Sequence, residues 1–311
     1  MASYANSEGV KKLHFQLEKS ASIEERARWF GLTLNQGLEA LLGQTSVSSE
    51  QIASVVISGM ASASIGWKEL PYEETPIDLH SARLSYEVLE YRCEQLPHSP
   101  ICLLSGLSTQ WDVIRGEETL LLGLVEQGAL GPGESLVVLP GTHSKHVTIE
   151  AGVVTKFRTF MTGELFELLA SHSILRDSVA TEAVLDKLAS HELPPAFIEG
   201  LEAVSEMGLG EVYFQVRARG LLNEQWSLSA GRLFLSGCLI GGELQSLVGR
   251  SGSTIIAAAE PLRSCYRNAC LYLGAPAVGL TVIEDGAMER LVVDGHLAFL
   301  RKQGQGSACL I

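Results

Sequence analysis

Two acidic residues at the expected start of a helix could take part in phosphoryl transfer. The segment Arg115-Gly116-Glu117-Glu118-Thr119 opens an apolar run that predicts a helix over residues 117–127. A carboxylate at this place can accept a proton from an attacking hydroxyl group. Acids are also common in the first helical turn, where they complement the helix dipole. The residues alone therefore leave a structural role open and do not choose between Glu117 and Glu118.

A second segment could hold the phosphoryl group itself. Residues 136–139 predict a buried strand, and Pro140-Gly141-Thr142-His143-Ser144-Lys145 comes directly after it. Gly141 would let a ligand approach the backbone, Thr142 and Ser144 would donate hydroxyl groups, and Lys145 would neutralise charge. The alternative is an ordinary polar β-turn.

Two further segments could hold a small anionic substrate. Arg158 lies just before an expected helix at 162–173, and its planar guanidinium is suited to a carboxylate. Thr162 and Glu164 in the same segment could equally be a helix cap and its dipole partner. The small-residue loop from Gly59 to Trp67 comes after an expected strand at 52–58, a common place for a ligand-binding loop.

The remaining pattern predicts alternating strands and helices. Ser22-Ile23-Glu24-Glu25 is a capping box that opens an amphipathic helix over 22–42. Further strands are expected at 101–104, 254–258 and 278–283, a hairpin at 147–157, and helices at 227–247, 261–273 and 286–301. Gly237, Gly241 and Gly242 are expected to interrupt the helix at 227–247. This alternation predicts an α/β fold with two domains, residues 1–110 and 111–311.

Composition excludes several classes of partner. The chain has 311 residues, a net charge of −13 and a pI near 5.1, so binding to nucleic acid or to an anionic membrane is disfavoured. No apolar run reaches membrane-spanning length, and no signal peptide is evident, so we expect a cytoplasmic protein. The six cysteines form no C-x-x-C pair, and no metal ligands are predicted.

Together these motifs resemble the 2-dehydro-3-deoxygalactonokinase family. The resemblance covers about residues 7–287 and rests on Gly59-Met60, Gly66-Trp67, Pro71-Tyr72, 115–119, 139–145, 157–165 and His172-Ser173. It implies two ribonuclease-H-like domains around a cleft, as in the actin-like ATPase superfamily. It also implies a kinase that uses ATP and Mg²⁺ to phosphorylate the C6 hydroxyl of 2-dehydro-3-deoxy-D-galactonate in galactonate degradation.

The resemblance also implies roles for single residues. Glu117 would be the general base, because it occupies the place of the family's acid at a helix start. The sugar acid would contact Gly59, Trp67, Arg115, Glu118, Arg158 and Glu164. The phosphates and nucleotide would contact Gly141, Thr142, His143, Ser144, Lys145, Ala258 and Ala259.

The chain departs from the family pattern in two places. The family's Asp-x-Gly-Thr phosphate loop is missing, and Ser7-Glu8-Gly9-Val10 resembles the family segment just after that loop, so the first domain is expected to be N-terminally truncated. Ala257-Ala258-Ala259-Glu260-Pro261 stands where the family favours a Gly-containing turn. A degenerate, non-catalytic sugar-acid-binding module and a kinase of a related keto-deoxy sugar acid are the alternatives. A homo-oligomer also stays open.

Overall fold

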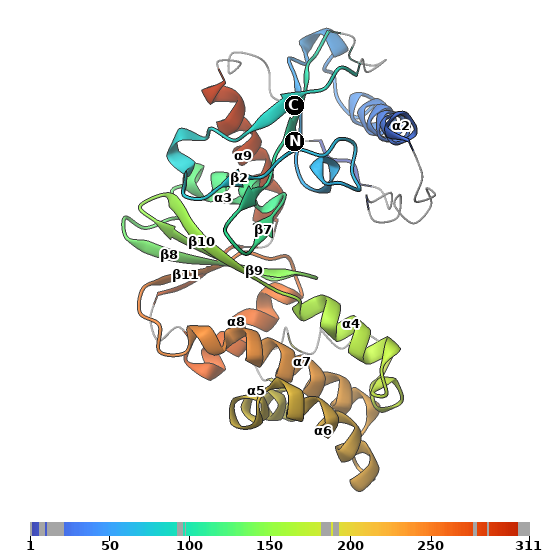
Figure 1. Cartoon of the computed structure of the whole chain (residues 1–311), viewed down its shortest axis with the longest axis vertical. Coiled ribbons are helices and arrows are strands. Elements are labelled where there is room, and N and C mark those ends of the chain that lie inside the picture. Colours follow the sequence, from blue (N-terminus) through green and yellow to red (C-terminus); the bar gives the residue numbers. More distant parts are fainter. Residues whose placement is uncertain are drawn as a thin grey trace. The chain divides into compact units, whose positions relative to one another are not determined.

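The computed structural model describes residues 2–5, 10, 22–91, 96, 98–181, 188, 193–275, 279–284 and 286–303. The chain forms two compact units (Figure 1). The first unit combines Met1–Ala129 with Glu289–Ile311, and the second is Leu130–Met288. Ser7, Glu8 and Gly9, on which part of the family resemblance rests, lie outside the described residues.

The first unit begins with helix α2 (Ile23–Leu42). The predicted capping box is confirmed: the Ser22 hydroxyl accepts from the Glu25 backbone N–H, and the Glu25 carboxylate accepts from the Ser22 backbone N–H. Phe30 on α2 stacks on Trp67, with ring centroids 5.5 Å apart. Helix α2 therefore covers a core that also contains Leu70, Leu96, Ile101 and Leu103.

Two small sheets complete this part of the first unit. Strand β5 (Ile101–Leu104) lies between β1 (Val55–Ile57), which is parallel to it, and β4 (Tyr86–Val88), which is antiparallel. Strand β6 (Leu107–Ser108) pairs with β2 (Glu73–Glu74) and with β7 (Val113–Ile114). The short elements between them are η1 (Ser49–Gln51), η2 (Met60–Ser62), β3 (Ile77–Asp78) and η3 (Leu79–Ser81). All four residues of β5 are buried, as its apolar run predicts.

Helices α3 (Glu117–Glu126) and α9 (Ala287–Lys302) pack closely in the first unit. A methyl group added at Gly123 would lie 2.1 Å from the Leu291 carbonyl oxygen, and one at Gly295 would lie 2.0 Å from that of Thr119. The two glycines therefore let the helix backbones touch. The last helix of the described chain thus holds the helix that carries the candidate carboxylates.

The second unit is built on one twisted sheet with the strand order β12-β11-β8-β9-β10 (Figure 1). Strands β8 (Glu134–Leu139) and β10 (Val153–Phe160) both run antiparallel to β9 (Ser144–Glu150), which lies between them. Strand β11 (Ser253–Ile256) is parallel to both β8 and β12 (Leu280–Val282). The first part of the strand expected at 278–283 lies outside the described residues.

Helix α7 (Leu228–Leu244) is the centre of the helical layer. It contacts α4 (Thr162–His172), α5 (Pro195–Met207), α6 (Leu209–Leu222) and α8 (Leu262–Leu273), and η6 (Gln245–Leu247) extends it. One further turn, η4 (Arg176–Ser178), lies after α4. Apolar side chains from the sheet, among them Leu136, Val138 and Ile256, meet Phe197 and Ile240 in one core.

The expected interruption of α7 by glycines is wrong. The helix runs unbroken through Gly237 and Gly241, and these residues instead let α5 approach. A methyl group at Gly237 would lie 2.2 Å from the Phe197 carbonyl oxygen, and one at Gly200 would lie 2.3 Å from that of Phe234. Tertiary packing thus offsets the helix-weakening tendency of glycine.

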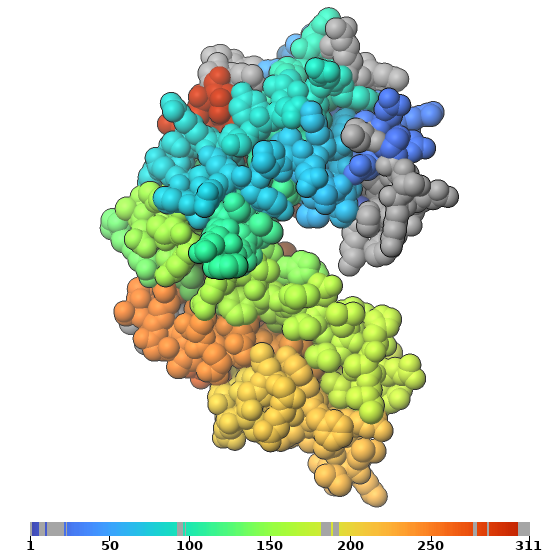
Figure 2. Space-filling view, viewed as in Figure 1, coloured from blue at the N-terminus to red at the C-terminus, as the bar shows by residue number. Residues whose placement is uncertain are grey.

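The boundary between the two compact units does not lie at residue 110. That position lies inside the first unit, because β6 and β7 pair across it. Helix α6 had no counterpart in the sequence prediction, since its apolar residues lack a clear period. It lies at the surface of the second unit (gold in Figure 2) and exposes Phe214, Leu221 and Leu222.

Candidate functional site

The predicted helix start in the first unit is a tight turn whose side chains form hydrogen bonds to its own backbone. Gly116 has φ of +106°, a conformation that favours glycine. The Glu117 carboxylate accepts from the Arg115 backbone N–H at 2.8 Å, and Glu118 accepts from the Gly116 N–H at 2.6 Å. The Thr119 hydroxyl donates to the Gly116 carbonyl at 2.7 Å. Both carboxylates therefore sit at the positive end of α3.

The two carboxylates have different environments. Glu118 is fully buried, and burial raises the pKa of its carboxyl group to about 8. Its Oε1 atom has no hydrogen-bond partner within the described part of the chain. Glu117, in contrast, is partly exposed. Of these two acids, Glu117 is the one that combines solvent access with a position at the helix end.

Arg115 and Gly59 meet the same turn. The Arg115 guanidinium donates to the Ser62 hydroxyl at 2.5 Å and to the Leu70 carbonyl at 3.1 Å. It lies 4.1 Å from the centroid of the Tyr72 ring. The Gly59 Cα would be 3.1 Å from a methyl group on Gly116, so the small-residue loop touches the helix start.

Trp67 is a core residue of the first unit. Its side chain is 5% exposed and packs between the rings of Phe30 and Tyr91. In the structure Trp67 helps to fix the loop from Gly59, and its predicted contact with the substrate stays a prediction. That loop is anchored by backbone bonds from Trp67 and Lys68 to the Ala61 carbonyl.

In the second unit the polar turn joins β8 to β9. Strand β9 begins at Ser144, so Ser144 and Lys145 are strand residues, and the turn itself is shorter than predicted. Space around Gly141 is open, since a methyl group there would meet nothing within 4 Å. The Thr142 carbonyl accepts from the Glu164 backbone N–H at 3.0 Å. The His143 ring contacts the Glu164 carboxylate at 2.5 Å, which docks the turn on the start of α4.

Gly163 makes this docking possible. A methyl group on Gly163 would lie 2.7 Å from the Thr142 Cα. The Lys145 ammonium group donates to the His143 carbonyl at 2.6 Å, so a positive charge lies against the turn. These contacts bring together Gly141, Thr142, His143, Lys145 and Glu164.

A buried carboxylate that the sequence analysis missed lies behind this turn. Glu243 on α7 is 2% exposed and is bonded to His146 (3.0 Å), to the Tyr266 hydroxyl (2.7 Å) and to the Thr162 hydroxyl. Tyr266 also contacts the Ser144 hydroxyl at 3.2 Å. This Glu243 network ties α7, α8, β9 and the start of α4 together. Its partners are 23 to 97 residues from Glu243, so no local pattern could reveal it.

A small apolar cavity adjoins the turn. Its volume is about 100 Å³, and its lining includes Gly141, Thr162, Phe166, Ile240 and Tyr266. The hydroxyl groups of Thr162 and Tyr266 belong to the Glu243 network, while the other walls are mainly apolar. The cavity has the character of a site for the apolar part of a ligand whose charged part meets the turn.

Ala258, Ala259 and Arg158 lie elsewhere in the second unit. Ala258 is buried and Ala259 is exposed after β11. Neither lines the cavity beside Gly141. Arg158 is exposed on β10 and lines a different cavity.

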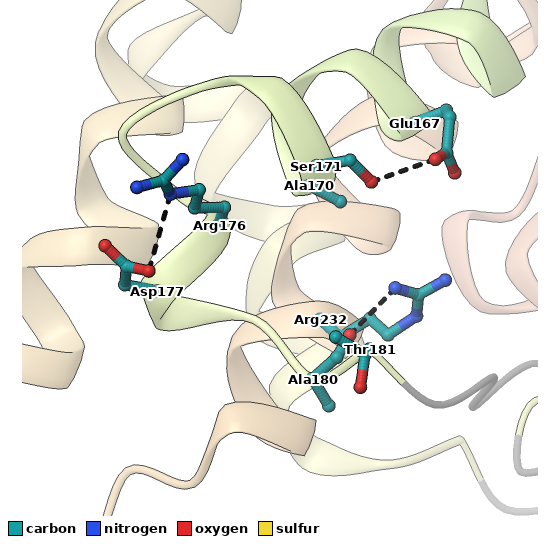
Figure 3. Close-up of a pocket in the computed structure, with 8 residues that line it drawn as sticks. All are labelled: Glu167, Ala170, Ser171, Arg176, Asp177, Ala180, Thr181 and Arg232. Carbon is teal, nitrogen blue, oxygen red and sulfur yellow. Dashed lines mark hydrogen bonds and ion pairs between the residues drawn. The ribbon is translucent and has the colours of Figure 1, made fainter.

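Another cavity, of about 410 Å³, lies between α4 and α7 (Figure 3). Its polar groups are bonded among themselves: Ser171 donates to Glu167 at 2.9 Å, Arg176 pairs with Asp177 at 3.5 Å, and Arg232 donates to the Ala180 carbonyl at 2.8 Å. None of the residues that line it was predicted as a site residue. We assign no ligand to it.

Comparisons with known proteins agree with the resemblance seen in the sequence. The chain is 38% identical over 248 residues to "Probable 2-dehydro-3-deoxygalactonokinase DgoK1" of Rhizobium meliloti (strain 1021), covering 76% of each protein. It is 31% identical over 265 residues to the 2-dehydro-3-deoxygalactonokinase of Escherichia coli (strain K12), covering 81% of this chain and 83% of that protein.

A solved structure is also similar. It is a crystal structure of a candidate 2-dehydro-3-deoxygalactonokinase from Sinorhizobium meliloti, with a TM-score of 0.72 and 30% identity. The similarity covers 89% of this chain and 87% of that one. Relatives and fold together define the class: the chain is a kinase, a phosphotransferase.

The family is shown by a match along most of the sequence. The chain belongs to the 2-keto-3-deoxy-galactonokinase family, whose model matches residues 5–290. This confirms the predicted family, and the mixed α/β class is confirmed with it. Among the residues that the structure describes, none of the helices is long and apolar enough to span a membrane.

Proposed function

We propose that this protein transfers the γ-phosphoryl group of ATP to the C6 hydroxyl of 2-dehydro-3-deoxy-D-galactonate. The family supports the substrate class. The single observation that carries the chemistry is the Gly116–Glu117 turn, where a partly exposed carboxylate is fixed at a helix start. The two units would be ribonuclease-H-like domains, and the sheet order of the second unit supports this.

Glu117 would accept the proton of the C6 hydroxyl as the oxygen attacks. The Arg115 N–H bonded to Oε2 of Glu117 would keep the carboxylate oriented for this step. The buried Glu118 would hold the Gly116 turn rather than act as the base. General-base help of this kind is worth about 10²–10⁴-fold in rate.

The turn from Gly141 to Lys145 would hold the phosphates of ATP. Gly141 leaves its backbone open to a ligand, Thr142 would donate its hydroxyl, and Lys145 would add positive charge. His143 would contact the phosphates beside them. Ser144 is buried in contact with Tyr266, so we give it a supporting role. The cavity beside Gly141 would take an apolar part of the nucleotide. Ala258 and Ala259, which do not line that cavity, stay proposed nucleotide contacts.

The sugar acid would contact the loop at Gly59 and the groups around Arg115 in the first unit. Arg158 and Glu164 remain proposed substrate contacts from the second unit. Magnesium would accompany the nucleotide phosphates. Among the described residues there is no group of three or more His, Cys, Asp or Glu that could hold a metal ion, so we assign no ligand to it.

Substitution of Glu117 tests its role as the base. Glu117→Gln should lower kcat by at least about a hundredfold, because the amide cannot accept the proton. A coupled ADP-release assay with ATP, Mg²⁺ and 2-dehydro-3-deoxy-D-galactonate measures it, with melting temperature as the control for folding. Glu118→Gln is the matched variant and should retain most of the rate.

Two other results would change the proposal. Turnover of a related keto-deoxy sugar acid at a higher kcat/KM would change the substrate. A protein that is inactive with every acid but whose melting temperature rises with the sugar acid would be a binding module, and the kinase proposal would fail.

A further inference from the structure

A third cavity in the second unit has a basic lining. Its volume is about 310 Å³, and it lies where β8, β9 and β10 meet the chain after α7. The residues that carry the argument are His146, Lys156, Arg158 and Arg250. None of the turn residues Gly141 to Lys145 lines it.

Strand register explains why these side chains share one face. Thr148 is paired with Leu136 on one side and with Lys156 on the other, and His146 is paired with Arg158. Directly paired residues project to the same face, about 4.5–5.5 Å apart at Cβ. Lys156 and Arg158 are two residues apart on β10, so both project toward that face.

Two positive charges in the lining lack an acidic partner among the described residues. Neither Lys156 nor Arg158 forms an ion pair within this part of the chain, whereas Arg250 pairs with Glu134. The Arg158 guanidinium lies near the aromatic ring of Phe160, at 5.7 Å from its centroid. In a protein with a net charge of −13, uncompensated positive charge on a cavity wall favours an anionic ligand.

Two buried nitrogen atoms on the lining residues also lack partners. His146 Nδ1 and Arg250 Nε are both buried and have no hydrogen bond among the described residues. A buried polar atom without a partner costs about 1–3 kcal/mol, so such atoms are usually satisfied by protein, water or ligand. Here the two atoms belong to residues of one cavity.

The Glu243 network defines what His146 can offer. Glu243 accepts from the hydroxyl groups of Thr162 and Tyr266, so its carboxylate acts as an acceptor. Nε2 of His146 is then the donor toward Glu243. In the neutral ring this leaves Nδ1 as an acceptor, which suits a hydroxyl group of a ligand.

We propose that this cavity binds a small hydroxylated acid, either a carboxylate or a phosphate ester. Its anionic group would lie between Lys156 and Arg158, with Arg250 donating beside them. In this proposal Arg158 binds this acid in place of the sugar-acid substrate that the sequence assigned to it. One of its hydroxyl groups would donate to His146. His146 is bonded to Glu243, which is bonded to Tyr266 and Thr162. Ligand binding would therefore also perturb Ser144, which contacts Tyr266, and the start of α4 at Thr162.

The test is calorimetric titration of the full chain, without nucleotide, with glycerol 3-phosphate, glycerate and inorganic phosphate. Glycerol 3-phosphate or glycerate should bind, and the better of the two identifies the anionic group. Inorganic phosphate lacks a carbon-borne hydroxyl and should bind at least about fivefold more weakly than glycerol 3-phosphate. The ¹⁵N resonance of His146 Nδ1 should shift with the bound ligand, a readout that binding at the Gly141 turn would not produce directly.

The double substitution Lys156→Gln with Arg158→Gln should weaken binding at least about tenfold. The control is Arg217→Gln, which removes a positive charge from the surface of α6 in the same unit. Absence of binding, equal binding to the double variant, or an unshifted His146 resonance would each overturn the proposal. A protein in which only inorganic phosphate binds would overturn it as well.

Discussion

Glu117 and Glu118 are adjacent residues of one type, yet their surroundings separate their chemistry. Both accept a backbone N–H of the same turn. Glu118 is removed from water, and the cost of burying a charge holds its carboxyl group in the neutral form at neutral pH. The sequence could place both acids at a helix start but could not show which one faces solvent.

Stability should therefore depend on pH through Glu118. Its folded-state pKa of about 8 is above the unfolded value of 4.5, so the folded state binds the extra proton between these values. The free energy of unfolding should fall as pH rises through this window, by up to about 1.4 kcal/mol per pH unit. Glu118→Gln should remove this fall, as urea unfolding at pH 5, 7 and 9 would measure.

The control for this experiment is Glu224→Gln, which removes one acidic group from the exposed surface. If wild type and Glu118→Gln lose stability in parallel between pH 5 and pH 9, Glu118 is not the source of the fall.

Helices and strands of the second unit are held behind the turn by Glu243. A single carboxylate joins α7 to β9, α4 and α8, and a buried acceptor with several donors is costly to disturb from either side. The network thus gives the turn a fixed support that short-range sequence patterns do not encode.

Glu243→Gln should show how much the Glu243 network contributes to the free energy of unfolding. The amide keeps the shape but places an N–H₂ group where an acceptor is needed, so we expect a loss of about 1–3 kcal/mol in unfolding free energy. Urea denaturation measures it. Glu202→Gln is the matched control, because Glu202 accepts from the Tyr272 hydroxyl at 2.5 Å on the exposed surface. Equal losses in both variants would contradict a special role for the buried acid.

The close approach of the α5 and α7 backbones depends on glycine. Gly237→Ala should lower the free energy of unfolding by about 1–3 kcal/mol, because the added methyl group would lie 2.2 Å from the Phe197 carbonyl oxygen. Gly210→Ala on α6 is the control: its methyl group meets nothing within 4 Å, so stability should stay or rise by up to about 1 kcal/mol. Thermal unfolding compares the two, and a stable Gly237→Ala protein would contradict the packing argument.

Local patterns predicted local structure well. The capping box at Ser22, the apolar strand at 101–104 and the helix from Glu117 all formed with nearly the expected bounds. The misses share one cause, which is dependence on distant parts of the chain. Glu243 is bonded to residues of β9, α4 and α8, and the cavity at His146 arises from strand register that no sequence period specifies.

The two units have different continuity along the chain. The second unit is one uninterrupted stretch, Leu130–Met288, inserted between α3 and α9 of the first. The first unit is therefore completed only by a helix that comes after the whole second unit, and the glycine contacts of Gly123 and Gly295 show how closely this helix packs.

Fragments that correspond to the two units should therefore differ in the cooperativity of their unfolding. Residues 130–288 expressed alone should unfold in one cooperative urea transition, because the sheet and its helical layer lie within this stretch. Residues 1–129 should lack such a transition, since α3 would expose the face that α9 covers. Adding a peptide of residues 287–303 to residues 1–129 should restore part of the cooperative transition. Circular dichroism would follow unfolding of the two fragments and of the mixture. A cooperative transition in 1–129 alone would show that α9 is dispensable.

The inserted arrangement has a consequence for synthesis on the ribosome. Residues 130–288 are all synthesised between α3 and α9, so they delay completion of the first unit by the length of the whole insertion. The stretch that carries Glu117 and Glu118 emerges earlier but must wait for α9, with an apolar helix face uncovered in the meantime. During that interval the nascent chain is most exposed to chaperones and to aggregation, although the stretch involved was made first.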